Sequence, residues 1–333
     1  MTQRKDRPQT TGPNSGRTSA RTDNRWVTAD KGALASELLA YFEQHKPEPA
    51  SFPAMASRVI DLVEHPDVDV ARLAHVIERD PAICAAVLAV ANSAANRRSS
   101  PVQAIRTATT LLGLKRVANI AVGIACRSLF DVELRVQHEL FPHWWSRLFH
   151  ASMTEAFAAS FVAMERMHHA SEGIFLAGML HNIGASLALR SLATLIIGGS
   201  LPGVPDESTI EAVLRSTRVP IGVMALTSFQ LPQSQIQICL TQTAEVVPDG
   251  PEWFDTHIIR LVSALNELRM GTLDTAEPLR LLHDSRAALG LVPQDVVNIA
   301  KQLSEHAAQV ELLFSTTDGS DETGFLEFLE RTL

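Results

Sequence analysis

The clearest helix signal in the sequence is the run Ile77-Glu-Arg-Asp-Pro-Ala-Ile-Cys-Ala-Ala-Val-Leu-Ala-Val-Ala-Asn-Ser93. Asp80 is suited to cap a helix N-terminus, and Pro81 is suited to the first helical position, where its missing N–H is not needed. Apolar residues then follow at three- and four-residue spacing, which predicts one buried face. Asn92 comes after the last of them, where a short polar side chain can bond free carbonyl groups. The run therefore predicts a buried helix that begins at Pro81 and ends near Asn92.

The same periodicity extends over most of the chain from about residue 31. Apolar residues recur at four-residue spacing at Leu34, Leu38 and Phe42 and again at Met55, Val59 and Val63. Strand-like alternation between turn signals is hard to find. We therefore expect an all-α fold, a multi-helix bundle of roughly a dozen helices.

Further helix boundaries are predicted by capping residues. Ser100 before Pro101 is typical of a helix start, and Ser208 with Glu211 forms a capping-box pattern. Gly113 stands where a helix should end, and so does Gly290.

Composition narrows the class of protein. The 333 residues are 46% hydrophobic and 20% charged, a balance that excludes fibrous and wholly disordered proteins. The net charge of −8 argues against a nucleic-acid binder, which usually carries a basic excess. Cys84, Cys126 and Cys239 are far apart in apolar surroundings, so we expect neither a disulfide framework nor a cysteine zinc site. An apolar run of about 18 residues is missing, so we expect no membrane span and a cytoplasmic location.

Four further motifs follow the helix at residues 77–93. They are Ser100-Pro-Val-Gln-Ala-Ile105, Leu111-Leu-Gly-Leu-Lys-Arg116, Ala177-Gly-Met-Leu-His-Asn-Ile-Gly184 and Phe229-Gln-Leu-Pro232. In this order and spacing the chain resembles the HDOD family, a branch of the HD-domain superfamily. The resemblance covers about residues 48–245, with a helical continuation to about 313, and it implies an HD-like helical bundle.

The domain organisation follows from these boundaries. Residues 1–30 are rich in Thr, Ser, Arg, Pro and Gly and are expected to form a disordered basic tail. Residues 31–313 are expected to form the HDOD-like helical domain. Residues 314–333 are expected to contain a mobile polar linker and a short terminal helix.

The resemblance also implies where a metal site would lie. HD-superfamily hydrolases hold a divalent metal with two histidines and two aspartates, and the metal activates water for attack on a phosphoester. Carried over by position, the histidines are His150 and His181. The paired aspartate is replaced by Asn182, and the last aspartate falls near Ser263. Further histidines of some members would fall near Val219 and around residues 242–243, and neither place holds a histidine.

The replaced carboxylates decide the expected chemistry. An amide and a hydroxyl leave a neutral ligand set, whereas a metal bound by oxygen and nitrogen ligands needs anionic charge to offset its desolvation. We therefore expect no catalytic residues, no bound metal and no cofactor, with His150, His181, Asn182 and Ser263 as vestigial ligand positions. The HDOD resemblance implies the same, since the family looks like a non-catalytic branch.

The leading hypothesis is a non-enzymatic bacterial signalling or regulatory module, which binds an unidentified partner protein or a small ligand in the remnant cleft. One alternative is a residual metal-dependent phosphohydrolase that uses His150 and His181. The other is a nucleotide or nucleic-acid binding module whose N-terminal arginines contact phosphates, with binding that weakens steeply with salt.

Purely structural roles compete with these site assignments. A histidine among apolar helical neighbours, such as His150 or His181, is often a hydrogen-bonded core residue. Asn182 and Gly184 are consistent with a helix C-cap, because both residue types tolerate the left-handed conformation. The adjacent pair at residues 168–169 is expected at the surface, since neighbouring side chains on a helix do not face each other.

Overall fold

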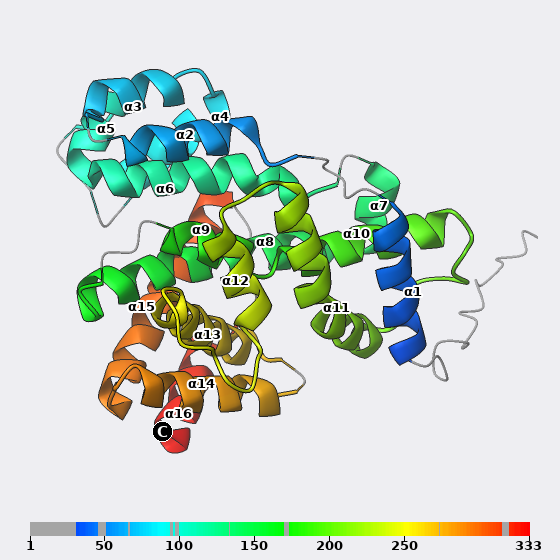
Figure 1. The fold of residues 1–333 in the computed structure, drawn as a ribbon. Helices are drawn as coiled ribbons and strands as arrows, with labels where there is room; N and C mark the ends of the chain where they lie inside the picture. The colour runs from blue at the N-terminus through cyan, green and yellow to red at the C-terminus, as the bar shows by residue number, and fades with distance from the viewer. Residues whose placement is uncertain are drawn as a thin grey trace, which may run out of the picture.

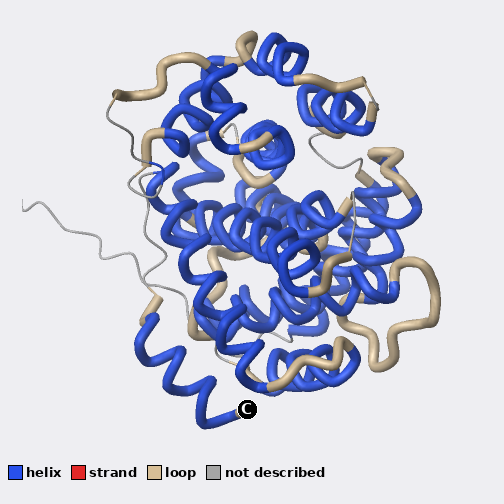
Figure 2. Tube along the Cα trace, turned by 90° about the vertical axis from the view of Figure 1, so that its left-hand side faces the viewer, coloured by secondary structure: helices blue, strands red, loops and turns tan. Residues whose placement is uncertain are grey.

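The computed structural model describes residues 31–45, 51–65, 67–93, 96, 100–132, 134–169, 173–272, 274–314 and 320–333. Throughout these residues the regular structure is helical, which confirms the all-α fold (Figure 2). The α-helices are α1 (Lys31–Gln44), α2 (Ala54–Glu64), α3 (Val70–Ile77), α4 (Pro81–Ala91), α5 (Ile105–Leu112), α6 (Leu114–Ala125), α7 (Arg135–Leu140), α8 (Pro142–Phe161), α9 (Ile174–Leu180), α10 (Ile183–Ile197), α11 (Glu207–Ser228), α12 (Gln233–Thr241), α13 (Trp253–Arg269), α14 (Ala276–Ala288), α15 (Pro293–Phe314) and α16 (Glu322–Thr332). A 3-10 turn η3 (Cys126–Leu129) follows α6, and a π-helical turn η4 (Val162–Arg166) follows α8.

The helices form three groups that follow the order of the chain (Figure 1). Helices α2 to α6 pack on one another at one end, and α13 to α16 form the opposite end. Helices α8 to α12 lie between them, with α10 against α11 and α8 against both α9 and α13. Helix α1 does not pack beside α2 but lies against α10 and α11. The middle group therefore contacts both ends, and α15 also reaches α4 of the first group.

The helix predicted from residues 77–93 forms as α4. Asp80 Oδ1 accepts hydrogen bonds from the N–H groups of Ala82 at 2.9 Å and Ile83 at 3.1 Å, so Asp80 is the expected N-cap. At the other end the side-chain amide of Asn92 donates to Leu88 O at 2.9 Å. The same amide pairs with both backbone groups of Val102, at 2.8 and 2.7 Å. Asn92 therefore ends α4 and fixes the following segment to it.

Two other predicted helix starts are wrong. The helix expected at Pro101 begins at Ile105, because Asn92 holds both backbone groups of Val102 and keeps that stretch out of a helix. The cap of α11 is Asp206 rather than Ser208, because a carboxylate accepts from Thr209 N–H at 2.8 Å more strongly than a hydroxyl would. This hydrogen bond, aided by one from Ser208, lowers the pKa of Asp206.

The ends of the chain extend this picture. The expected tail at residues 1–30 and residues 315–319 lie outside the described residues. Helix α16 packs against α13 and α15, and it buries Phe325 and Leu329 in the apolar cluster of the C-terminal group. Among the described residues, the stretch Ile174–Ile197 is long and apolar enough to span a membrane, but 72% of its window is buried inside the fold, as in a core helix.

Helices α10 and α11 cross at two glycines. A Cβ atom at Gly184 would overlap the carbonyl oxygen of Arg218 and lie 2.5 Å from Gly222 N. A Cβ at Gly222 would lie 2.8 Å from Cys239 Sγ. The expectation of a left-handed cap here is wrong: Asn182 has φ −102°, and Gly184 lies inside α10. Gly184 is needed for close backbone approach rather than for a turn.

We expect Gly184→Ala to lower the free energy of unfolding by about 1–3 kcal/mol or more, because backbone atoms cannot yield to the added methyl group. Urea unfolding followed by circular dichroism measures this loss. Gly250→Ala is the matched control, since its Cβ would find its nearest neighbour at 3.8 Å. Equal losses in both variants would contradict the close-approach role of Gly184.

A buried histidine on α15 predicts acid sensitivity. The His306 ring stacks on Phe157 at 5.8 Å, and neither of its nitrogens has a hydrogen-bond partner among the described residues. Burial, with the charge of Arg116, lowers the pKa of His306 to about 4. The unfolded chain therefore binds more protons than the folded chain between about pH 6.5 and pH 4.

The free energy of unfolding should fall as the pH is lowered through this window. The free energy of unfolding of the His306→Phe variant should fall less steeply over the same range, because phenylalanine keeps the stacking and cannot be protonated. Urea unfolding at several pH values gives both slopes. Parallel slopes for the two proteins would show that His306 does not contribute.

Candidate functional site

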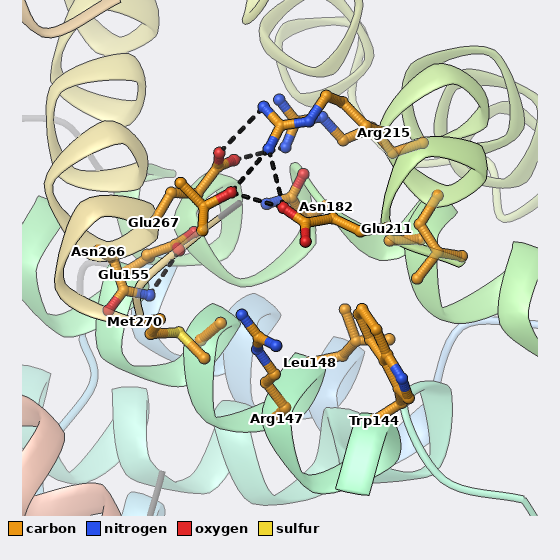
Figure 3. Close-up of a pocket in the computed structure, with 15 residues that line it drawn as sticks. Trp144, Arg147, Leu148, Glu155, Asn182, Glu211, Arg215, Asn266, Glu267 and Met270 are labelled. Atoms are coloured by element: carbon orange, nitrogen blue, oxygen red, sulfur yellow. Dashed lines mark hydrogen bonds and ion pairs between the residues drawn. The ribbon is translucent and has the colours of Figure 1, made fainter. Parts of the chain in front are cut away.

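The candidate site lies where α8, the junction of α9 and α10, α11 and α13 meet. Its centre is a cavity of about 110 Å³. The side chains around it are drawn in Figure 3, and the labelled ones include Glu155 from α8, Asn182 from the α9–α10 junction, Glu211 and Arg215 from α11, and Asn266 and Glu267 from α13. Residues more than 100 positions apart in the chain therefore share one small volume.

His181 lies behind this cavity in the protein interior. Its Nδ1 is 2.9 Å from the carbonyl oxygen of Gly178, one turn earlier. Its Nε2 is 2.9 Å from Glu155 Oε2 and 3.3 Å from Ser263 Oγ. The side chains of His181 and Glu155 are 0% and 2% exposed, so water does not solvate this pair. Both imidazole nitrogens are therefore already engaged by protein atoms.

The two ring nitrogens of His181 have different hydrogen bonds. A carbonyl oxygen only accepts, so Nδ1 of His181 carries a hydrogen. Nε2 has Ser263 Oγ as its hydrogen-bond partner. Glu155 Oε2 lies 2.9 Å from Nε2 but is buried without a hydrogen bond among the described residues, so the two groups are in close buried contact without an aligned hydrogen bond.

The other oxygen of Glu155 is held by α13. Asn266 Nδ2 donates to Glu155 Oε1 at 2.7 Å. Asn266 Oδ1 accepts from Arg269 at 3.2 and 3.1 Å, which fixes the orientation of the amide. Arg269 in turn donates to Glu322 on α16 at 2.8 Å. A continuous set of hydrogen bonds thus runs from the C-terminal helix to the buried pair.

The structure brings together three of the four residues that the sequence analysis named. His181 and Ser263 are in contact, and Asn182 lines the cavity beside them. His150 does not join them. It lies in a second cavity of about 60 Å³, where its ring is 5.9 Å from Phe314 at the end of α15.

The placement of His150 has a simple geometric cause. Successive residues on an α-helix point about 100° apart, so a step of five residues is one full turn plus about 140°. His150 and Glu155 therefore point to different sides of α8. Glu155 is the residue of α8 that meets His181. The expectation that His150 shares the site with His181 is therefore wrong, and Glu155 is the residue of α8 that lies there.

A network of arginines and glutamates forms one wall of the cavity. Arg215 contacts Glu211 at 3.3 Å, Glu267 at 3.4 Å and Glu277 at 2.9 Å. Arg218 contacts Glu267 at 2.6 Å and Glu277 at 3.6 Å. Burial disfavours the ionised form of Glu267, but the charges of Arg218 and Arg215 outweigh it and hold the pKa of this carboxyl below its usual range.

Comparison with known proteins now identifies the family. The HDOD domain model matches residues 50–244, more than half of the chain. The chain belongs to the HDOD family. No curated protein matches it. Among the solved structures, the HDOD fold is shared with a candidate metal-dependent phosphohydrolase from Shewanella amazonensis, with 22% identity, a TM-score of 0.60, and 83% of this chain and 99% of that chain covered.

Two other structures show the same HDOD architecture. An HDOD domain protein of unknown function from Geobacter sulfurreducens has 18% identity and a TM-score of 0.60, and the match covers 86% of this chain and 100% of that one. A candidate signal transduction protein from Marinobacter aquaeolei has 22% identity and a TM-score of 0.52, with 90% of this chain and 67% of that chain covered. At these identities the likeness shows the fold alone.

The metal of HD-superfamily hydrolases does not fit the residues of this HDOD site. Within the described part of the chain, no group of three or more His, Cys, Asp or Glu side chains is arranged to hold a metal ion. His181 has both nitrogens engaged, and Asn182 and Ser263 are neutral. Gln242, near one position of a further family histidine, donates to His181 O at 2.5 Å instead.

Several residues of this candidate site were missed by sequence reasoning. Glu155 could have been noticed as a lone acid in the apolar stretch Ala151–Phe161. Glu211 lies four residues before Arg215 on α11 and is a local partner, but Glu267 and Glu277 come from α13 and α14, so no local pattern predicts their contacts with the arginines. Ser263 was found only through the resemblance, and Asn266 lies one turn after it on the same face.

The buried pair should contribute strongly to stability. His181→Ala leaves Glu155 buried without its partner, and we expect the free energy of unfolding to fall by about 3–5 kcal/mol. A double-mutant cycle with Glu155→Gln should show that the two losses are not additive. Urea unfolding at pH 7 measures each variant.

The control is a partly exposed histidine pair, His169 Nε2 and Asp255 Oδ1 at 3.0 Å, with side chains 35% and 16% exposed. Its His169→Ala variant should lose less than about 1 kcal/mol. Additive losses in the Glu155 and His181 cycle would show that the two residues act independently.

Proposed function

We propose that this HDOD chain is a non-catalytic signalling or regulatory module that acts by binding a partner protein or a small ligand at the cavity beside His181. The observation that carries the proposal is the set of donor atoms: among the described residues no group of three or more His, Cys, Asp or Glu side chains is arranged to hold a metal ion, and Nε2 of His181 faces Glu155 and Ser263. A site arranged in this way supports recognition rather than metal-assisted hydrolysis.

Electrostatics support this proposal. A divalent cation would need two or more anionic ligands to offset its desolvation, and the nearest carboxylates are already committed. Glu155 is held by His181 and Asn266, while Glu211 and Glu267 are paired with Arg215. Opening the site for a metal would leave the buried Arg218 and the partly buried Arg215 with fewer counter-charges, which costs stability.

The cellular role and location are part of the proposal. The structurally similar Marinobacter protein is described as a candidate signal transduction protein, and we extend that role to this chain. All three cysteines are free thiols, and Cys239 has its pKa raised to about 12 by burial, which makes it unreactive. These thiols suit a reducing compartment, so we propose a bacterial cytoplasmic protein.

Elemental analysis combined with a phosphoester assay tests the proposal. Protein incubated with Mn²⁺, Ni²⁺ or Zn²⁺ and desalted should retain much less than one metal ion per chain. Hydrolysis of bis(p-nitrophenyl) phosphate should equal that of His181→Ala protein prepared in the same way. One firmly held ion, lost together with hydrolysis in His181→Ala, would instead establish the residual phosphohydrolase.

A further inference from the structure

Several polar groups that line the cavity, among them those of Arg147 and Asn182, have no hydrogen-bond partner among the described residues. The guanidinium of Arg147, on α8, stacks over Trp144 at 5.3 Å and forms no ion pair among the described residues. Figure 3 shows it extending into the cavity from the wall opposite Arg215. Asn182 Oδ1 is buried and has no hydrogen-bond donor among the described residues. The guanidinium can only donate and the amide oxygen can only accept, so a ligand would need an acceptor for Arg147 and a donor for Asn182.

The two walls of the cavity also differ in net charge, with the negative wall beside Asn182 and the positive wall at Arg147. Arg215 and Arg218 carry two positive charges, and their partners Glu211, Glu267 and Glu277 carry three negative ones. This wall therefore has an excess of one negative charge, and Asn182 Oδ1 adds a partial one. Arg147 supplies one positive charge on the opposite wall. The cavity is thus dipolar although its total charge is close to zero.

Size and lining restrict the occupant further. A volume of about 110 Å³ is slightly below the roughly 150 Å³ of a cavity that holds benzene, and far below the roughly 300–1,000 Å³ of pockets for drug-sized ligands. A dinucleotide is therefore too large. Leu148, Leu214 and Met270 give the lining an apolar part, beside polar residues such as Asn266 and Thr272, and this part suits a short aliphatic group.

We propose that this cavity binds a small zwitterion, an α-amino acid with a short apolar side chain. Its carboxylate would pair with Arg147, its ammonium group would donate to Asn182 Oδ1 and Glu211, and its side chain would lie against Leu148 and Leu214. The inference rests on the proposed function, because it assigns a ligand class to the same cavity.

Ligands that carry only one charge fit this cavity less well. A simple carboxylate or phosphate would pair with Arg147, but it would face the excess negative charge around Glu211 and leave Asn182 Oδ1 without a donor. A simple amine would satisfy Asn182 but leave Arg147 unpaired. A buried polar group without a partner costs about 1–3 kcal/mol, so each one-charge ligand loses part of its binding energy.

Titration calorimetry with matched ligands tests the proposal on the full chain. L-alanine, L-valine and L-methionine are compared with their methyl esters, which lack the carboxylate charge, and with their N-acetyl forms, which lack the ammonium charge. At least one free amino acid should bind, and its ester and its N-acetyl form should each bind at least about tenfold more weakly. A short peptide with the same N-terminal residue distinguishes a free amino acid from a chain terminus and should also bind more weakly.

Variants locate the binding. Arg147→Gln should weaken binding of the free amino acid by about 10–100-fold and abolish the preference for it over its methyl ester. Arg135→Gln, which removes a 90% exposed arginine on α7, should leave binding unchanged. Circular dichroism establishes that both variants fold.

Absence of binding by all amino acids would overturn the inference, and so would equal binding of acid and ester to the native protein. Neither result alters the metal content or the hydrolysis rate, so the proposed function is judged separately.

Discussion

The site of this protein depends on one buried contact between an acid and a histidine. Glu155 on α8 and His181 at the end of α9 lie 2.9 Å apart and almost completely out of water, so removing either one leaves the other buried with fewer polar neighbours. The pair is completed by Asn266 and Ser263 of α13, so three helices must be correctly placed before Glu155 can be buried. This requirement ties the middle helices to the C-terminal group and occupies the imidazole that a metal would need.

The second constraint is steric. The crossing at Gly184 and Gly222 brings the backbone of α10 against that of α11. Asn182 lies two residues before this crossing and Arg218 lies at it, so close packing of the two helices places the amide beside the arginine network. The polar wall of the cavity is therefore a direct consequence of how tightly two core helices approach.

Sequence signals predicted the ends of α4 correctly, because the hydrogen bonds that determine them lie within a few residues along the chain. The capping of α4 by Asp80 and its ending at Asn92 depend on groups within a few residues, and both were predictable. The cap of α11 was misplaced by two residues, because Ser208 and Asp206 offer competing acceptors and the carboxylate prevails. The resemblance to HDOD proteins located His181, Asn182 and Ser263. It could not show which side of α8 faces His181, because that depends on the rotation of a helix whose apolar surface surrounds it on several sides.

The family-matched segment ends at residue 244, but the site does not. Ser263, Asn266 and Glu267 all lie on α13, beyond that boundary, and Asn266 is held in place through Arg269 by the last helix. A chimaera that exchanged only residues 50–244 between two relatives would place Glu155 and His181 beside the α13 of another chain. Interchangeability among HDOD proteins should therefore follow the sequence of α13 as much as that of the recognisable domain.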